Sequence, residues 1–560
     1  MEYFRSKLDA IGRKKKPPRQ WFFVAYDQLN LHFGPWSKMQ PNQAGLVLVE
    51  SLWKPNQRPY HKQKLAFLLS SMRHFALEAA EHGHPVVYLS GTQSYAQALE
   101  EFADEHGALT FMRPAERELR QHLAPLVQAG LLLESQHEGW LTTPDDFLAA
   151  IKGKKSWRMD SFYRVVRKRT QILMDSQGKP EGGKLSYDAE NRKPWKGDPP
   201  APQIPTFTPN KVTQEVGDLV KEVFSDHPGE LELTTIPATH RDVQRVWKWG
   251  LSECLTHFGP FEDAMSKDSS NLFHTRLSPL LNLHRLLPRQ VLDDVLATKL
   301  PLPSKEGFIR QLIGWREFVY HVHEYTDGFR KNVPWKPSSR RAPGDGGYKN
   351  WLGKDWRPKE LGERAGGGAT PNALKLTTPL PPMFWGEKSG LYCLDHVIEE
   401  VLRDGYGHHI TRLMVLSNWS MLLGIDPRDV TDWFWVAYVD AYDWVVEPNV
   451  LGMGTFATGD LMITKPYVSG SAYINKMSDF CSACAFHPKK NCPMTSMYWG
   501  FLHEHRESLA SNPRLKLVMA SSRKRSDAQK SLDAAVASLV KSKLSKAEVV
   551  TPSDVKALLK

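Results

Sequence analysis

Residues 405–444 read GYGHHITRLMVLSNWSMLLGIDPRDVTDWFWVAYVDAYDW, and apolar side chains recur in this stretch at intervals of three and four. That period is typical of amphipathic helices. It recurs upstream, in VGDLVKEVF (216–224), GFIRQLIGWREFVYHVHEYT (307–326) and LDHVIEEVLRDG (394–405). The second half of the chain, residues 213–515, is therefore predicted to form a large all-α domain.

The pattern is different before residue 150, where strand-like and helical segments alternate. WFFVAYDQLN (21–30), GLVLVES (45–51) and PVVYLSG (85–91) read as strands, and a helical period covers residues 61–83. This alternation predicts a Rossmann-like α/β domain with a parallel sheet over residues 21–150.

Polar residues follow two of the predicted strands, where a parallel sheet binds its ligands. They are Asp27, Gln28 and Glu50. We therefore expect a ligand site there, although Asp27 also suits a turn or a helix N-cap.

Other segments lack the pattern of a packed core. Residues 151–212 read as a connector, because 178–212 are rich in Pro, Gly and charge. Residues 328–372 are basic and aperiodic, which indicates a long exposed loop, either a solvated linker or a flap over a phosphate backbone. Residues 1–20 form a basic extension, and residues 516–560 form a basic helical one.

Composition limits the partners and the location. The chain has 560 residues and a formal charge of +11, which favours a polyanionic partner because Lys and Arg displace counterions from phosphates. Its 18 Trp suit core packing, base stacking or electron transfer. Without a signal-peptide core or an apolar run of about 18 residues, we expect a cytoplasmic, nucleoid-associated monomer with no membrane partner.

Three of the five cysteines lie together, in CSACAFHPKKNCP (481–493). Cys481, Cys484 and Cys492 have the spacing of metal ligands, and a reducing compartment argues against a disulfide framework. The fourth ligand is open: His487 would complete a zinc site, whereas Cys254 or Cys393 would complete a [4Fe-4S] site. Free thiols are the third alternative.

Three motifs of the helical domain occur in a specific order: HTRLSPLL (274–281), RQLIGWREF (310–318) and HHITRLM (408–414), followed by DAYDW (440–444). This order resembles the photolyase and cryptochrome flavoproteins, in particular the iron–sulfur bacterial members, which include prokaryotic (6-4) photolyases. The likeness covers residues 21–515 apart from the loop before 372. It includes DAENR (188–192), FGPFEDAM (258–265), EPNVLGM (447–453) and YINKMSDFCSAC (473–484).

The resemblance implies three cofactors. FAD would lie in the helical domain, a [4Fe-4S] cluster would be held by Cys393, Cys481, Cys484 and Cys492, and an antenna chromophore, 6,7-dimethyl-8-ribityllumazine, would bind near Asp27, Gln28 and Glu50. Cys254 lies outside the motif and is expected to pack in the core.

The resemblance also implies the roles of the site residues. His409 would be the catalytic histidine, consistent with the proton transfers that the reaction needs, in a lesion pocket with His408, Tyr467 and Trp315. Electrons would reach the flavin through Trp385 and Trp433, with Trp435 as a substitute further along. The FAD contacts would be His274, Thr275, Arg276, Leu277, Ser278, Arg316, Arg412, Asp440 and Val446.

Each of these residues also has a structural interpretation. Thr275 or Ser278 suits a helix N-cap, Arg412 and Asp440 suit a helix–helix salt bridge, and a histidine in a helix is often structural. The sequence departs from the family at three positions: Phe434 replaces an oxidisable Tyr, Val446 replaces a polar group facing the flavin, and Tyr26 replaces a Gly in the antenna site.

These features favour a blue-light-dependent (6-4) photolyase, which flips a lesion out of UV-damaged DNA and transfers an electron to it from reduced FAD. The alternative is a cryptochrome-type photoreceptor with the same cofactors and little repair. A third hypothesis is a zinc-stabilised nucleic-acid binder without catalysis.

Overall fold

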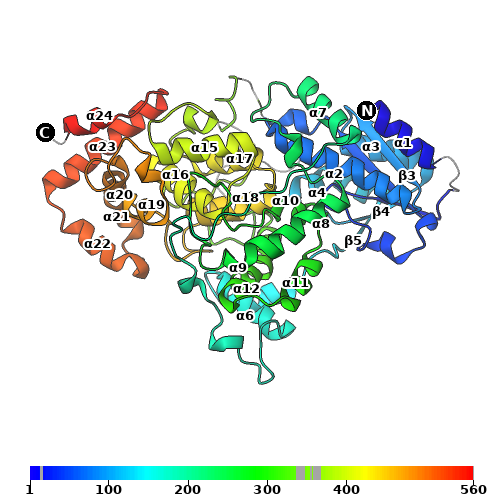
Figure 1. Cartoon of the computed structure of the whole chain (residues 1–560), viewed down its shortest axis with the longest axis horizontal. Helices are drawn as coiled ribbons and strands as arrows, with labels where there is room; N and C mark the ends of the chain where they lie inside the picture. The colour runs from blue at the N-terminus through cyan, green and yellow to red at the C-terminus, as the bar shows by residue number, and fades with distance from the viewer. Residues whose placement is uncertain (13–16, 336–346, 354–355, 357–367, 559–560) are drawn as a thin grey trace.

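The computed structural model describes residues 1–12, 17–335, 347–353, 356 and 368–558. The molecule is elongated, with the α/β domain at one end, the helices after residue 490 at the other end, and the remaining helices between them (Figure 1). No described helix is long and apolar enough to span a membrane.

The predicted parallel sheet is confirmed, with strand order β3-β2-β1-β4-β5 and every pairing parallel. All eight residues of β2 are buried, as a central strand covered on both faces requires. The strands are β1 (Gln20–Phe23), β2 (Ala44–Ser51), β3 (Val86–Gly91), β4 (Leu109–Met112) and β5 (Leu132–Ser135). The helices here are α2 (Lys62–Glu81), α3 (Tyr95–His106), α4 (Arg117–Gln128), α5 (Pro144–Ile151) and α6 (Met159–Thr170).

The N-terminal extension contains a helix, α1 (Glu2–Gly12), that packs onto this domain. The Phe4 ring is fully buried and meets the edge of Tyr88 with centroids 4.8 Å apart. The α-amino group of Met1 forms an ion pair with Glu215 at 3.2 Å. Residues 2–12 are thus part of the α/β core rather than a free basic tail.

Helices dominate after residue 210, as predicted. The helix expected over 430–445 is interrupted, because residues 438–442 leave the helical conformation between α17 and α18. The α-helices are α7 (Lys211–Val223), α8 (His240–Trp249), α9 (Leu255–Phe258), α10 (Ser278–Asn282), α11 (Pro288–Ala297), α12 (Leu302–Ile309), α13 (Glu317–Thr326), α15 (Tyr392–Asp404), α16 (Asn418–Leu423), α17 (Pro427–Ala437), α18 (Asp443–Val446), α19 (Ser471–Met477), α20 (Pro493–Glu504) and α21 (Arg506–Leu509).

Four segments of the predicted all-α domain are π-helical rather than α-helical. They are η7 (Gly250–Cys254), η8 (Arg310–Arg316), η10 (Thr411–Ser417) and η11 (Glu447–Gly454). A π-helical turn inserts a residue and rotates the side chains after it, and such turns often occur at functional sites.

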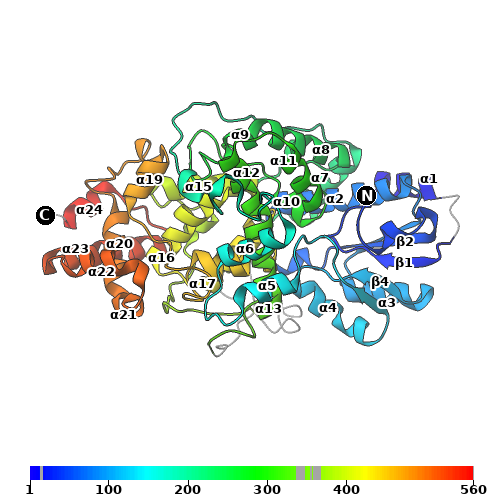
Figure 2. The same ribbon diagram turned by 90° about the horizontal axis from the view of Figure 1, so that it is seen from below.

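The C-terminal extension forms three helices, α22 (Lys516–Arg523), α23 (Asp527–Ser545) and α24 (Pro552–Leu558). Helix α23 lies beside α20 at the far end of the molecule from the sheet (Figure 2). Buried Val536, Val540 and Leu544 tie it to the core. Much of the predicted basic loop lies outside the described residues, namely 336–346, 354–355 and 357–367. Its interpretation as a flap therefore stays a prediction.

Candidate active site

The helical domain contains a deep cavity of about 320 Å³, within the range of small-molecule and cofactor sites. Segments η8, η10 and η11 all contribute to its wall, together with α10 and the turn before it. Twelve residues of the predicted site line it: His274, Thr275, Arg276, Leu277, Ser278, Trp315, Arg316, His408, His409, Arg412, Asp440 and Val446.

Arg412 and Asp440 form a bidentate ion pair in this wall. The Arg412 guanidinium donates to the two carboxylate oxygens at 3.0 and 2.9 Å, and the Ser278 hydroxyl donates to one of them at 2.6 Å. Burial opposes ionisation of Asp440, but Arg412 more than compensates and lowers its pKa. A charged pair therefore faces the cavity, where it can hold and polarise a planar heterocycle.

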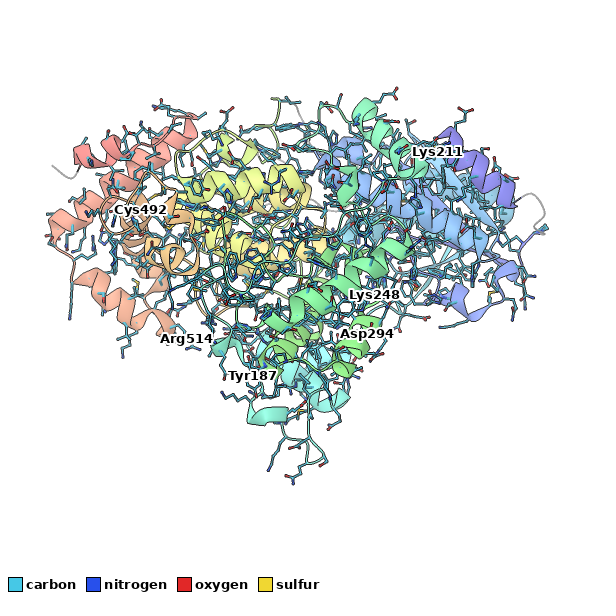
Figure 3. All side chains as sticks on the ribbon, viewed as in Figure 1. Tyr187, Lys211, Lys248, Asp294, Cys492 and Arg514 are labelled. Carbon is cyan, nitrogen blue, oxygen red and sulfur yellow. The ribbon has the colours of Figure 1, made fainter. Side chains whose placement is uncertain are left out.

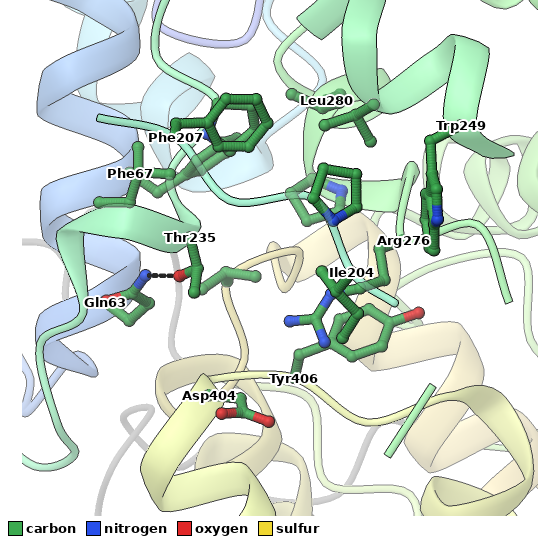
Figure 4. A pocket seen from close by; sticks show the side chains of 16 residues that line it. Gln63, Phe67, Ile204, Phe207, Thr235, Trp249, Arg276, Leu280, Asp404 and Tyr406 are labelled. Atoms are coloured by element: carbon green, nitrogen blue, oxygen red, sulfur yellow. Dashed lines mark hydrogen bonds between the residues drawn. The ribbon is translucent and has the colours of Figure 1, made fainter. Parts of the chain in front are cut away.

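The turn before α10 separates the main cavity from a smaller one. Arg276 has a φ of 53°, and its guanidinium lies 4.1 Å from the centroid of the Tyr406 ring. Figure 4 shows this stacked pair in the smaller cavity of about 60 Å³, facing Gln63 and Phe67 of α2. The backbone N–H groups at the start of α10 and the Arg276 charge form a cationic rim suited to phosphates.

Three histidines meet at the mouth of the main cavity, and their ring nitrogens lie within 4.8 Å of one another. His274 and His408 are buried and stacked, with ring centroids 4.4 Å apart. Burial lowers the pKa of both imidazoles well below the usual value, so both are neutral at physiological pH. The side chain of His409 is 44% exposed, and its Nε2 lies 3.7 Å from the Asp263 carboxylate.

Val446, the apolar residue predicted to face the flavin, lines the cavity. Glu447 points away and accepts hydrogen bonds from His323 at 3.0 Å and Arg428 at 2.8 Å. Asn449, one turn further along η11, does line the cavity. The sequence interpretation missed Asn449, although Val446 and Asn449 are three residues apart and such positions share a face of a helix.

Tyr467 does not lie in the wall of this cavity. It is half-buried, and the charges that act on its hydroxyl are Asp188, Arg192, Asp160 and Arg158. Of these two residues predicted for the lesion pocket, Trp315 thus lies in the cavity wall and Tyr467 does not.

The predicted electron-transfer tryptophans lie on two sides of α17. Trp433 is fully buried, and its Nε1–H donates to the Phe384 carbonyl at 2.8 Å, next to Trp385. Trp435 is also buried, and the Arg58 guanidinium lies 4.3 Å from its ring centroid. Trp435 thus faces the α/β domain and does not provide the surface end of a path through Trp433.

The four predicted cluster cysteines come together near the start of α20, where Cys492 precedes Pro493 (Figure 3). Burial and the other three thiols raise the pKa of Cys393. Burial raises the pKa of Cys481 to about 11 and that of Cys492 to about 12. The thiols therefore disfavour joint ionisation unless a cationic centre replaces their protons.

Neighbouring groups donate hydrogen bonds to these sulfurs. The Trp419 Nε1–H lies 3.4 Å from the Cys393 sulfur, and the Phe486 N–H lies 3.5 Å from the Cys484 sulfur. Among the described residues, the histidine trio is the group of three or more side chains close enough to hold a single metal ion, and the four cysteines do not form a second such group. Cys254 lies elsewhere, fully buried beside the His274 carbonyl.

The side chains predicted for the antenna site each form hydrogen bonds with other residues of the α/β domain. Glu50 accepts from Arg73 at 2.6 and 2.8 Å and from the Tyr88 hydroxyl at 2.5 Å, with Glu50 and Arg73 fully buried. Gln28 donates to the Met112 carbonyl at 3.0 Å, and Asp27 accepts from the Ala115 N–H at 2.7 Å.

The crevice at the carboxyl ends of the strands is also nearly filled. Tyr26 projects into it beside Tyr95, Tyr442 and Trp435, and its hydroxyl accepts from Lys54 at 2.8 Å. The space left is about 40 Å³, enough for a few water molecules. The residues expected to bind 6,7-dimethyl-8-ribityllumazine therefore do not fit that chromophore, which corrects the sequence-based expectation.

A parallel α/β domain followed by a helical domain with one deep, cationic-rimmed cavity defines a photolyase-type protein. Comparison with known proteins agrees. Residues 22–235 match the family described as deoxyribodipyrimidine photo-lyase-related protein. A (6-4) photolyase of Agrobacterium fabrum (strain C58) is 33% identical over 520 residues, which cover 89% of this chain and 94% of that protein.

Comparison with solved structures shows the fold of a cryptochrome. The cryptochrome of Synechocystis sp. PCC6803 superposes with a TM-score of 0.51 at 16% identity, over 91% of this chain and 99% of that chain. The protein therefore belongs to the photolyase and cryptochrome family, in its photolyase-related branch. Members of this family generally bind FAD.

Proposed function

We propose that this protein is a blue-light-dependent (6-4) photolyase that repairs pyrimidine (6-4) photoproducts in UV-damaged DNA. The observation that carries the proposal is the position of His409, exposed at the cavity mouth beside two neutral, buried imidazoles that stack on each other. The +11 charge supports it, because phosphate contacts would hold a duplex over the cavity.

His409 would exchange a proton with the lesion. Transfer of a hydroxyl between two pyrimidines requires a proton donor at the exocyclic oxygen, and an imidazole can donate the proton and later recover it. His409 can reach a base flipped out of the duplex because its ring is exposed, and its Nε2 lies 3.7 Å from the Asp263 carboxylate. His274 and His408 would offer neutral hydrogen-bonding groups to the same base.

FAD fits the main cavity. Arg276 and the start of α10 would hold the pyrophosphate, the Arg412–Asp440 pair would lie beside the isoalloxazine, and Val446 would cover it with an apolar surface. Bound in reduced form, the flavin supplies a light-driven electron to the lesion. The residues of the wall position it and exclude water.

A [4Fe-4S] cluster fits the four cysteines better than zinc does. Tetrahedral zinc holds thiolates about 2.3 Å away, which brings the sulfurs to about 3.8 Å from one another. The four cysteines do not form such a close group, and this, together with the hydrogen bonds to two of their sulfurs, supports a larger iron–sulfur centre. His487 is exposed and its Nδ1 accepts the Lys489 N–H at 3.2 Å, which argues against its being a ligand.

A photoreceptor is the second candidate. Val446 favours it, because an apolar neighbour changes how the flavin's reduced forms are stabilised, and Leu517 of α22, which is 85% exposed, offers an apolar contact to a partner. Under this alternative the protein would photoreduce without repairing DNA.

The test is repair of a synthetic (6-4) duplex by dithionite-reduced protein under blue light. His409→Ala is expected to slow repair by about 10²–10⁴-fold, the usual contribution of a positioned acid or base. His503→Ala, a change at an exposed histidine of α20, is the matched control and is expected to repair normally. Equal repair by His409→Ala and wild type would overturn the role of His409.

A further inference from the structure

We infer that Trp351 is the outer end of an electron-transfer path that re-reduces the flavin, in the order Trp351, Trp385, Trp433. The inference rests on the proposed flavin cofactor. Trp351 lies in the segment 328–372, outside the family likeness, and the sequence offered no role for it.

The path is continuous in the structure. The rings of Trp351 and Trp385 have centroids 5.6 Å apart. The Trp433 Nε1–H donates to the carbonyl of Phe384, one peptide unit from Trp385. Trp433 in turn contacts the ring of Phe434, with centroids 5.2 Å apart, and Phe434 lines the main cavity.

The local environment favours a positive charge at the outer end. Trp385 is buried, and its Nε1–H has no hydrogen-bond partner among the described residues. Trp351 is only partly buried, and its Nε1–H donates to the Asp226 carbonyl at 2.7 Å. Water and this hydrogen bond stabilise an oxidised indole, because a bond from a charged donor is stronger than one from a neutral donor.

The other aromatic residues near α17 are poor electron donors. The Arg58 guanidinium over Trp435 disfavours a second positive charge on that ring. The Arg412 guanidinium lies 4.1 Å from the Tyr438 ring centroid, and the Tyr438 hydroxyl has no partner among the described residues to take its proton. Phe434 is not readily oxidised. The path therefore leads away from the α/β domain, toward Trp351.

The electron balance is closed by an external donor. One electron passes from Trp433 to the light-excited oxidised flavin, one from Trp385 to Trp433, and one from Trp351 to Trp385. The oxidised Trp351 would then be reduced by dithiothreitol. Two such turnovers supply the two electrons that full reduction of the flavin needs, convert one dithiothreitol to its cyclic disulfide and release two protons, of which the flavin takes one. No bond of the protein is broken.

The experiment is photoreduction of the FAD-loaded, cluster-containing protein with dithiothreitol, followed by flavin absorbance. Trp351→Phe is expected to slow photoreduction by at least about tenfold. The positive charge then remains on Trp385, and loss of one charge-assisted hydrogen bond to the oxidised ring lowers the population of the charge-separated state by about that factor. Trp351→Tyr, which stays oxidisable, is expected to recover part of the rate. Trp435→Phe is the control and is expected to photoreduce as wild type does.

A second readout detects the oxidised tryptophan itself and does not use flavin absorbance. Aerobic illumination without thiol should oxidise Trp351 in wild type, detected as a mass increase of its peptide, and Trp433→Phe should abolish that oxidation. Normal photoreduction by Trp351→Phe, or no oxidation at Trp351, would overturn the inference. Repair by dithionite-reduced Trp351→Phe should equal that of wild type. Failure of repair by both the variant and wild type would count against the proposed function and not against the electron-transfer path.

Discussion

The buried pair Arg412–Asp440 provides the most quantitative prediction. Asp440→Asn keeps the shape of the side chain but removes its charge, leaving the guanidinium without a counterion. Removing one partner of a buried ion pair typically costs about 3–5 kcal/mol in the free energy of unfolding. Because the Arg412 side chain is still 21% exposed and the Asp440 side chain only 5%, water offsets part of this cost. We therefore expect a loss of about 3 kcal/mol.

Urea unfolding of the apoprotein, followed by circular dichroism, measures this loss, and FAD retention on gel filtration measures its effect on the site. Asp293→Asn is the matched control, because Asp293 and Arg289 are 3.7 Å apart and more than half exposed, and its effect should stay within about 0.5 kcal/mol. A loss below about 1 kcal/mol in Asp440→Asn, with FAD retained, would refute the argument that this pair is a desolvated, charged element of the site.

Further predictions concern the cluster, the α/β domain and its crevice. Cys492→Ser should lose iron and unfold at lower temperature, whereas Cys254→Ser should keep its iron; iron analysis and absorbance decide this. Burial raises the pKa of Asp27 to about 6 from 3.8. The unfolded chain therefore releases this proton at lower pH than the folded protein does, and the free energy of unfolding should fall by about 3 kcal/mol as pH rises from 4 to 7. Asp27→Asn should remove that part of the pH dependence, and an unchanged urea midpoint profile would contradict it. Added 6,7-dimethyl-8-ribityllumazine should not co-elute with the protein, and stoichiometric co-elution would show that the crevice opens.

The sequence predicted the sheet, the helical half and most of the cavity wall, because hydrophobic period and motif order both depend on local patterns. It could not predict the π-helical segments η8, η10 and η11, since a period of 3.6 looks the same with or without one inserted residue. Asn449 lines the cavity beside Val446 because residues three apart share a face of a helix, a signal that the sequence interpretation did not use.

Contacts between distant segments are the second feature that the sequence could not predict. The Arg73–Glu50–Tyr88 cluster and the contact of Trp351 with Trp385 join residues far apart in the chain. The place of Tyr467 outside the cavity wall also depends on such contacts. Tyr26 did indicate a narrowed crevice, because a phenol ring there occupies space that glycine leaves open. The sequence alone did not show how completely that space is filled.

The central claim, that the cavity with His409 at its mouth repairs (6-4) photoproducts, is tested most directly by counting restored pyrimidines in a synthetic (6-4) duplex. Chromatography of the digested duplex after blue illumination of reduced wild-type protein should show pyrimidines restored in proportion to light dose, with none restored in the dark. An unchanged lesion, in protein whose flavin is bound and reduced, would contradict the claim.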